Sequence, residues 1–224
     1  QVINLDEEED GSIRFMLAET YVQLSEDRKA IIYYSESMRR GKESAEIYFK
    51  RGSCYSRIED MENALSDLNQ AYNAGKKDAE LFLERANVNI RMDNSRAAMN
   101  DLNEAISRED KHADAYFNRG YLHELNENYS EAIKDYAKTI ELNPEDDVAF
   151  YSLANSLVSQ GNVSGALSPI NKAIELKPKN GGYYKVKGNI LYRLERSGEA
   201  CDHWRKAVEL GDQKASFYIS QYCD

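Results

Sequence analysis

The stretch Ala113-Asp-Ala-Tyr-Phe-Asn-Arg-Gly120 decides the fold, together with Ala132, Tyr136 and Pro144 further along the chain. Its pattern, with a bulky residue at the fourth place and a small one at the eighth, recurs every 34 residues in both directions, and Arg14 is the exception at the fourth place. The units span residues 11–44, 45–78, 79–112, 113–146, 147–180 and 181–214, without insertion or deletion. A fixed period of this length indicates a repeat architecture.

Two places in the unit hold only small residues. The eighth place is Ala18, Gly52, Ala86, Gly120, Ala154 and Gly188, and the twentieth is Ala30, Ala64, Ala98, Ala132, Ala166 and Ala200. Small side chains let two helix backbones approach closely, and larger ones would force them apart. The twenty-fourth place instead fills the space between adjacent units, with Tyr34, Leu68, Leu102, Tyr136, Ile170 and Trp204. We therefore interpret Trp204 as a packing residue.

Each unit contains two segments of about 13 residues whose apolar side chains follow helical spacing. In the fourth unit these segments are roughly 114–126 and 130–142. Glycines suited to left-handed helix ends follow the second segment in three units, at Gly41, Gly75 and Gly211. The sequence therefore predicts an all-α fold of helical hairpins, each of which becomes stable by stacking on the next.

The order of aromatic, small, alanine, aromatic, alanine and proline residues resembles the tetratricopeptide repeat (TPR) family. The resemblance covers residues 11–214, about nine tenths of the chain. It implies a right-handed superhelical solenoid of six helix-turn-helix repeats. One departure is the seventh place, usually Leu in the family, which is charged at Arg51, Arg85, Arg119 and Lys187. We expect their aliphatic stems to pack while the charges reach solvent.

The two ends and one proline lie outside the regular pattern. Residues 1–10 are acidic, and they form either a leader ahead of the first helix, where negative charge is favourable, or a disordered segment. Residues 215–224 are interpreted as a capping helix, in which Tyr222 takes the place that is Gly or Ala in every full unit. Pro169 lies inside the second helix of its unit and is expected to kink it.

Charge and hydropathy limit the classes of partner. The net charge of −10 argues against nucleic acid, whose binders carry basic patches. No apolar run approaches the roughly 20 residues that span a bilayer. We expect a soluble protein, a monomer or weak homo-oligomer, that is either cytoplasmic or, if a signal preceding Gln1 was removed, periplasmic.

No set of reactive residues converges in the pattern. The three histidines, His112, His123 and His203, fall in different units at unrelated places, without metal-ligand spacing. His123 stands where other units have tyrosine, which favours a half-buried packing role. The sequence predicts no catalytic residue, metal or cofactor, and hence a protein that is not an enzyme.

Three cysteines are too few and too scattered for a disulfide framework. Cys201 and Cys223 lie in neighbouring predicted helices near the C-terminal end and could meet. Spacing alone does not place their Cβ atoms within bonding reach. Unpaired thiols are the favoured interpretation, and the disulfide stays open.

A second stripe on the first helix of each unit is the candidate binding surface. Spacings of 3, 4 and 3 give it the second, fifth, ninth and twelfth places, and in TPR proteins this stripe lines the concave groove. Its fifth place is Phe15, Phe49, Leu83, Phe117, Tyr151 and Lys185, and its ninth place includes Asn87, Tyr121, Asn155 and Asn189. Glu46, Glu80 and Asp114 form an acidic rim, and the thirteenth place provides Arg57, Arg91 and Arg193 on the other side.

The carboxylate clamp with which some TPR domains hold chaperone tails is absent. Lys185 and Asn189 match its first pair, but only the short cap follows them. Asn118 matches its middle member without suitable partners in the units on either side. The resemblance therefore implies a different protein or peptide partner.

The recurring aromatic side chains predict a non-catalytic adaptor that binds a protein or peptide in its groove, because an exposed apolar strip usually marks a binding surface. In the alternative interpretation, neighbouring side chains bury these rings within a tight superhelix. A rival function is a structural subunit that self-associates through its ends or its convex face.

Overall fold

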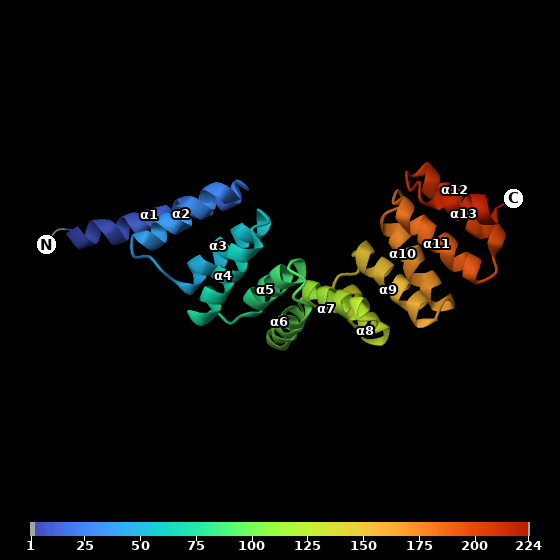
Figure 1. Cartoon of the computed structure of the whole chain (residues 1–224), viewed down its shortest axis with the longest axis horizontal. Coiled ribbons are helices and arrows are strands. Elements are labelled where there is room, and N and C mark those ends of the chain that lie inside the picture. Colours follow the sequence, from blue (N-terminus) through green and yellow to red (C-terminus); the bar gives the residue numbers. More distant parts are fainter. Residues whose placement is uncertain (1–2, 224) are drawn as a thin grey trace. The chain divides into compact units, whose positions relative to one another are not determined.

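The computed structural model describes residues 3–223, with side chains from residue 10 onward. Over this range the chain forms thirteen α-helices, one short 3-10 helix and no strand, which confirms the predicted all-α class (Figure 1). The helices divide between two compact units, Gln1–Asp110 and Lys111–Asp224.

The N-terminal unit consists of three helical hairpins. Its helices are α1 (Ile3–Gln23), α2 (Asp27–Arg39), α3 (Ala45–Arg57), α4 (Met61–Asn73), α5 (Ala79–Arg91) and α6 (Ser95–Arg108). Within the unit the hairpins stack through contacts of α2 with α3 and of α4 with α5. Residues 3–10, expected ahead of the first helix or disordered, belong to α1, whereas residues 1 and 2 lie outside the described part.

The C-terminal unit contains three further hairpins and a final short helix. Its elements are α7 (Ala113–Leu125), α8 (Tyr129–Leu142), α9 (Asp147–Gln160), η1 (Ser164–Ala166), α10 (Leu167–Leu176), α11 (Gly181–Arg193), α12 (Ser197–Glu209) and α13 (Ala215–Tyr222). The last of these, α13, packs on α12, and we refer to it as the cap.

Pro169 lies in the first turn of α10, whereas the sequence predicted it inside the second helix of its unit. The 3-10 turn η1 precedes α10, and Pro169 is the third residue of that helix. Backbone N–H groups in the first turn of a helix have no intrahelical acceptor, so proline removes no hydrogen bond there. The helix begins late enough to place the proline where it is tolerated.

Capping residues set the helix boundaries. Side chains of five N-cap residues accept a hydrogen bond from a backbone N–H of the first turn, at Ser44, Asp60, Asp78, Asp146 and Asn180. The three predicted helix-end glycines are left-handed, with φ of 83° at Gly41, 104° at Gly75 and 96° at Gly211. Both kinds of cap satisfy backbone groups that helix ends leave unpaired.

Glycine is required at the eighth place where the facing side chain is largest. A Cβ at Gly188 would lie 2.5 Å from Cδ1 and Nε1 of Trp204 and 3.1 Å from the carbonyl oxygen of Ala200. Carbon atoms in favourable contact are about 3.5–4.0 Å apart, so no side chain fits there. Trp204 is 1% exposed, which confirms its predicted packing role.

Charged side chains at the seventh place are paired inside the hairpins of three repeats, and the expectation that they reach solvent is wrong. Each arginine makes two hydrogen bonds, of 2.6–2.9 Å, to the aspartate sixteen residues later on the second helix. The arginine side chains are 15–22% exposed and the aspartates 7–8%. The pairs are Arg51–Asp67, Arg85–Asp101 and Arg119–Asp135.

A disulfide joins Cys201 of α12 to Cys223, directly after α13, with their Cα atoms 5.8 Å apart. The favoured expectation of unpaired thiols is therefore wrong for these two residues. The helices α12 and α13 pack together, and this contact brings the two Cβ atoms within bonding reach. Cys54 is free and buried, and burial raises the pKa of its thiol to about 12.

Candidate functional site

The predicted groove floor is largely packed in the N-terminal unit. Phe49 and Leu83 are only 7% and 9% exposed, and Phe15 is half-buried. The ammonium group of Lys76 lies 4.4 Å from the centroid of the Phe49 ring, and that of Lys42 lies 4.8 Å from the Phe15 centroid. Both distances suit cation–π contacts. Neighbouring side chains thus cover these rings, as the alternative interpretation held, and Asn87 beside them is half-buried.

The acidic rim of this unit converges on one lysine. The Nζ atom of Lys76 lies 3.3 Å from Glu46, 2.7 Å from Asp78 and 3.6 Å from Glu80. These hydrogen bonds and charges outweigh desolvation and raise the pKa of Lys76. Because the Lys76 ammonium group partly neutralises these carboxylates, the rim attracts a positively charged ligand less strongly.

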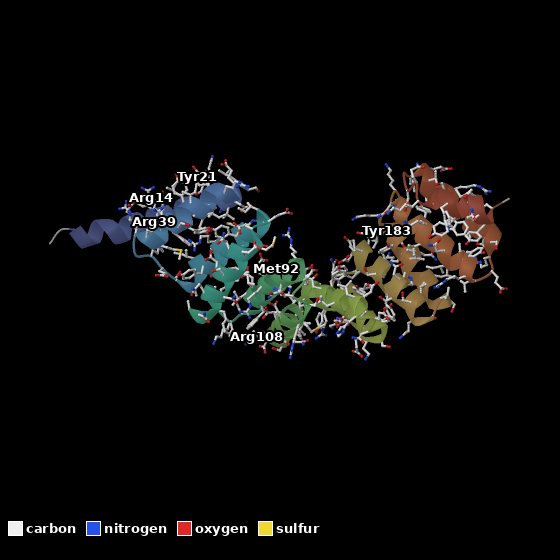
Figure 2. All side chains as sticks on the ribbon, viewed as in Figure 1. Arg14, Tyr21, Arg39, Met92, Arg108 and Tyr183 are labelled. Atoms are coloured by element: carbon white, nitrogen blue, oxygen red, sulfur yellow. A yellow bond between two sulfur atoms is a disulfide. The ribbon has the colours of Figure 1, made fainter. Side chains whose placement is uncertain are left out.

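The corresponding floor in the C-terminal unit is more accessible. Phe117 and Tyr151 are half-buried, and Tyr121 is 41% exposed. The ring centroid of Phe117 lies 5.5 Å from that of Tyr136, and the ring of Tyr151 lies 5.1 Å from that of Tyr183. Figure 2 labels Tyr183 in the C-terminal unit. Of the other predicted site residues in this unit, Asn118 is half-buried and Asp114 is exposed.

A pocket of about 340 Å³ lies among α9, α11, α12 and α13 of this unit, and we call it the C-terminal pocket. Two predicted groove residues, Asn155 and Asn189, line it. Its apolar lining includes Val158, Val186 and Ile190 from the same first helices. A few polar groups over an apolar lining is the usual composition of a ligand site.

Aromatic residues form one wall of the C-terminal pocket. The Tyr192 and Tyr222 ring centroids are 4.6 Å apart, and Trp204 stacks on Tyr218 at 5.2 Å. Tyr218 and Tyr222 belong to the cap α13, so the wall combines the sixth repeat with the cap. Sequence analysis did not find this wall. The available signal was Tyr222, a large residue at a place that is otherwise small.

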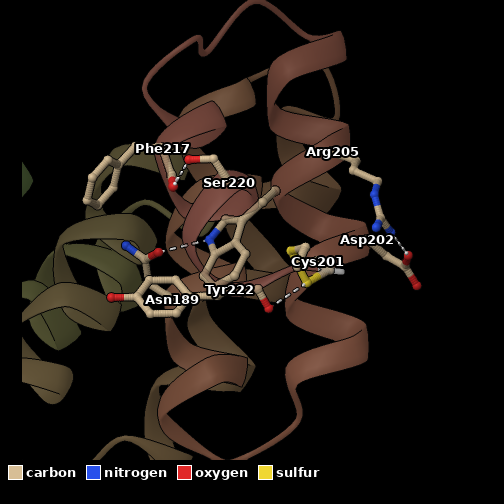
Figure 3. The surroundings of a disulfide bond; sticks show 9 residues. Asn189, Cys201, Asp202, Arg205, Phe217, Ser220 and Tyr222 are labelled. Carbon is tan, nitrogen blue, oxygen red and sulfur yellow. Dashed lines mark hydrogen bonds and ion pairs between the residues drawn. A yellow bond between two sulfur atoms is a disulfide. The ribbon is translucent and has the colours of Figure 1, made fainter.

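The disulfide fixes the end of the cap beside this wall. Figure 3 shows Cys201 and Tyr222 close together, with Cys223 following Tyr222 in the chain. The bond closes a loop with a sequence separation of 22. Because a covalent link restricts the end of α13, it also restricts the position of the Tyr222 ring.

The polar groups of the pocket offer mainly donors. Trp204 Nε1 donates to Asn189 Oδ1 at 2.9 Å, and the Asn189 nitrogen is on the opposite side of the amide (Figure 3). The side chain of Asn155 makes no hydrogen bond to another residue of the described range. Arg193 is the one charged residue of the pocket lining. An amide both donates and accepts, whereas a guanidinium only donates.

Lys185 and Asn189, which match the first pair of a carboxylate clamp in the sequence, both have partners within the chain. The Nζ atom of Lys185 lies 2.8 Å from Oδ2 of Asp212. Asn189 uses its oxygen for Trp204. Both residues therefore already hold partners within the sixth repeat and the loop that follows it.

Three other features bear on chemistry. Within residues 10–223, no group of His, Cys, Asp and Glu is arranged to hold a metal ion. His123 is half-buried, as predicted, with Nε2 4.0 Å from Asp135. Burial and the nearby charge of Lys187 lower the pKa of His203.

None of the helices described has the length and apolar character needed to cross a bilayer.

Comparisons with known proteins agree with this architecture. Family models described as tetratricopeptide repeat match residues 113–146 and 45–74. A search of curated proteins gives no match. Crystal structures similar to the chain include MamA, with 24% identity and a TM-score of 0.69 over 78% of this chain and 96% of that one.

Two further crystal structures are similar. YrrB, a TPR protein with an unusual peptide-binding site, has 19% identity and a TM-score of 0.74, over 84% of this chain and 97% of its own. The C-terminal part of a TPR repeat-containing protein from Cytophaga hutchinsonii has 20% identity and a TM-score of 0.79, over 93% and 87%. At these identities the likeness shows the fold.

Proposed function

Because the chain is a tetratricopeptide-repeat protein, we propose that it is a non-catalytic adaptor that binds a peptide segment of another protein in the C-terminal pocket and along the first helices beside it. TPR proteins are generally interaction modules that bind protein or peptide partners. One structural neighbour, YrrB, is itself a TPR protein with a peptide-binding site. The coarse function, a protein-interaction adaptor or scaffold, follows from the family.

One observation carries the finer proposal: two asparagines at the same repeat place line a pocket that the chain itself does not fill. Asn155 and Asn189 share the ninth place of consecutive repeats, on α9 and α11. The Asn155 amide can bond both the carbonyl and the N–H groups of an extended peptide, and the Asn189 nitrogen can donate to its carbonyl groups. The volume of about 340 Å³ is at the lower end of ligand pockets, which suits one anchoring side chain.

The half-buried floor residues extend this surface in our proposal. Phe117 and Tyr151 stand at the fifth place of the two repeats preceding the sixth, within the same unit. Their exposed edges can contact further peptide residues, since aromatic rings supply much of the energy at binding surfaces. The packed N-terminal floor, with Phe49 and Leu83, contributes less because its apolar area is already buried.

The test uses peptides selected from a phage-displayed random library on the whole protein, with affinities measured by fluorescence anisotropy. We expect Asn155→Ala and Phe117→Ala each to weaken the selected peptides about tenfold. The matched control is Asn171→Ala, the same change on the second helix of the fifth repeat, where Asn171 is exposed. Equal affinities for all three variants and the parent would rule out this surface.

A second candidate function, self-association, is favoured by a specific observation at the other end of the chain. The third place of the repeat is fully buried at Ile47, Leu81, Ala115 and Ala149, each 0% exposed. In the first repeat this place is Ile13, which is 46% exposed, and Met16 beside it is 58% exposed. Light scattering over a concentration series tests this function. A dimer that dissociates in the Met16→Lys variant would support it, and a monomer at all concentrations would exclude it.

A further inference from the structure

Arginine occurs at the thirteenth place of three repeats, and in the N-terminal unit it is neutralised. Nη2 of Arg57 lies 2.6 Å from Oδ1 of Asp27, and Nη2 of Arg91 lies 2.9 Å from Oε1 of Glu59. In both cases the carboxylate belongs to the preceding repeat. This place therefore holds a guanidinium with a carboxylate partner supplied by the chain.

Arg193 keeps the backbone contact of Arg91 and lacks the carboxylate. Nη1 of Arg91 donates to the carbonyl oxygen of Ser56 at 3.1 Å, and Nη1 of Arg193 donates to that of Val158 at 3.5 Å, in each case 35 residues earlier. The residue that corresponds to Glu59 is Gly161, which has no side chain. Within residues 10–223 no carboxylate forms an ion pair with Arg193.

The unneutralised guanidinium lines the C-terminal pocket beside other donors. The amide nitrogen of Asn189 and the unbonded amide of Asn155 line the same pocket. The Asn189 nitrogen and the Arg193 guanidinium can be satisfied only by acceptors, and a carboxylate is the acceptor that also neutralises Arg193. Hydrogen bonds between arginine and carboxylate are charge-assisted and frequently bidentate.

The aromatic wall determines what accompanies the carboxylate. Tyr192 and Tyr222, the exposed rings of this wall, would suit either a large apolar side chain or an organic cation, since aromatic faces attract both. Arg193 excludes the cation, because two like charges in one pocket repel each other. The remaining ligand is apolar at the wall and anionic at the guanidinium.

We propose that the C-terminal pocket selects peptides in which a large apolar side chain is adjacent to an Asp or Glu, with the apolar group against the aromatic wall and the carboxylate paired with Arg193. This inference rests on the proposed function and names the chemical class of its peptide. The acidic group is a side chain within the peptide, so a free C-terminus is not required.

The test exploits the single tryptophan of the chain, Trp204, which reports from the pocket wall. The probes are hexapeptides of glycine and serine with a central Phe–Glu pair, acetylated and amidated to remove terminal charges. Companion peptides replace Glu by Gln or Lys, or Phe by Ala. Tryptophan fluorescence and its indole N–H signal in NMR spectra give the affinities. We expect the Phe–Glu peptide to bind at least about tenfold more tightly than each companion.

Variants assign this preference to one guanidinium. In Arg193→Gln the Glu and Gln peptides should bind equally, whereas Arg91→Gln, at the same repeat place but with an internal carboxylate, should keep the tenfold difference. Circular dichroism verifies that both variants are folded. The difference should also shrink as salt increases, because the guanidinium is exposed.

The inference is overturned by equal binding of the Glu and Gln peptides to the parent, by a preference that survives Arg193→Gln, or by no binding of the Phe–Glu peptide at about 5 mM. An uncapped Gln peptide that binds as well as the capped Glu peptide would assign Arg193 to chain termini and would also overturn it. The proposed function is judged separately: it stands if library-selected peptides lose affinity in Asn155→Ala, and it falls if they do not.

Discussion

Removal of Asp67 should destabilise the protein far more than removal of an exposed charge. Asp67→Ala takes from the Arg51 guanidinium two hydrogen bonds, of 2.6 and 2.8 Å, and leaves it only the Ser35 hydroxyl at 2.9 Å. Breaking a buried ion pair costs about 3–5 kcal/mol. Because the Arg51 side chain is 17% exposed and can turn toward water, we expect the lower end, about 3 kcal/mol. In a chain of this length that lowers Tm by about 6–12 °C.

A double variant separates the ion pair from simple loss of packing. Arg51→Leu with Asp67→Tyr copies the Leu17 and Tyr33 of the first repeat, and we expect stability within about 1 kcal/mol of the parent. The double-mutant cycle compares this variant with its two single variants, Arg51→Leu and Asp67→Tyr. Urea and thermal unfolding followed by circular dichroism give the coupling energy between the two residues. Glu62→Ala, an exposed change on the same helix α4, is the control and should cost less than about 1 kcal/mol. A loss below about 1 kcal/mol for Asp67→Ala, or a double variant that shows the summed losses of the single ones, would refute the reasoning.

Three further changes test the packing, the cap and a buried carboxyl. Gly188→Ala should cost about 3 kcal/mol or more and shift the fluorescence of Trp204, because the added Cβ would lie 2.5 Å from the indole; an unchanged melting curve would contradict this contact. Cys201→Ser should lower the free energy of unfolding by about 3 kcal/mol, because the loop is no longer closed, and it should weaken peptide binding in the pocket. A reductant should produce both effects in the parent and neither in the variant. Burial raises the pKa of Glu84 above its usual 4.5, so the carboxyl favours folding when protonated and opposes it as pH rises through its folded value. Glu84→Gln should therefore raise the urea midpoint at neutral pH and lose that advantage below about pH 4.5. The same difference in urea midpoint at both pH values would contradict the claim that the ionised Glu84 carboxylate destabilises the fold.

The fold was predictable because close packing constrains the same places in every repeat. Only small residues allow the contact that Gly188 makes with Trp204, so the pattern of small and large residues is visible in the sequence alone. The Arg–Asp pairs were equally visible as a sixteen-residue spacing, repeated from Arg51 and Asp67 onward, but a search for repeated apolar residues does not register it. An ion pair between two repeat places therefore recurs with the same period as the residues that form it.

The candidate site was predictable only in part, because periodicity assigns a residue to a face without saying how much of that face its neighbours cover. Phe49 was assigned to the groove stripe, but the side chain of Lys76 covers its ring. Asn155 and Asn189 were assigned to the same stripe and line the pocket. The difference lies in side chains that approach from other elements, and no repeat period describes those.

The pocket lies where the repeat pattern is broken, and this is the physical reason that a site forms there. In the N-terminal unit the ring of Phe49 is packed, and the rim arginines Arg57 and Arg91 each pair with a carboxylate of the preceding repeat. In α13, Tyr222 stands at the place that is Gly or Ala in every full repeat, and its ring centroid lies 4.6 Å from that of Tyr192. Gly161 replaces the carboxylate that would neutralise Arg193. Independent departures would be scattered over the six repeats; these two leave an aromatic ring and a free guanidinium on the lining of one pocket.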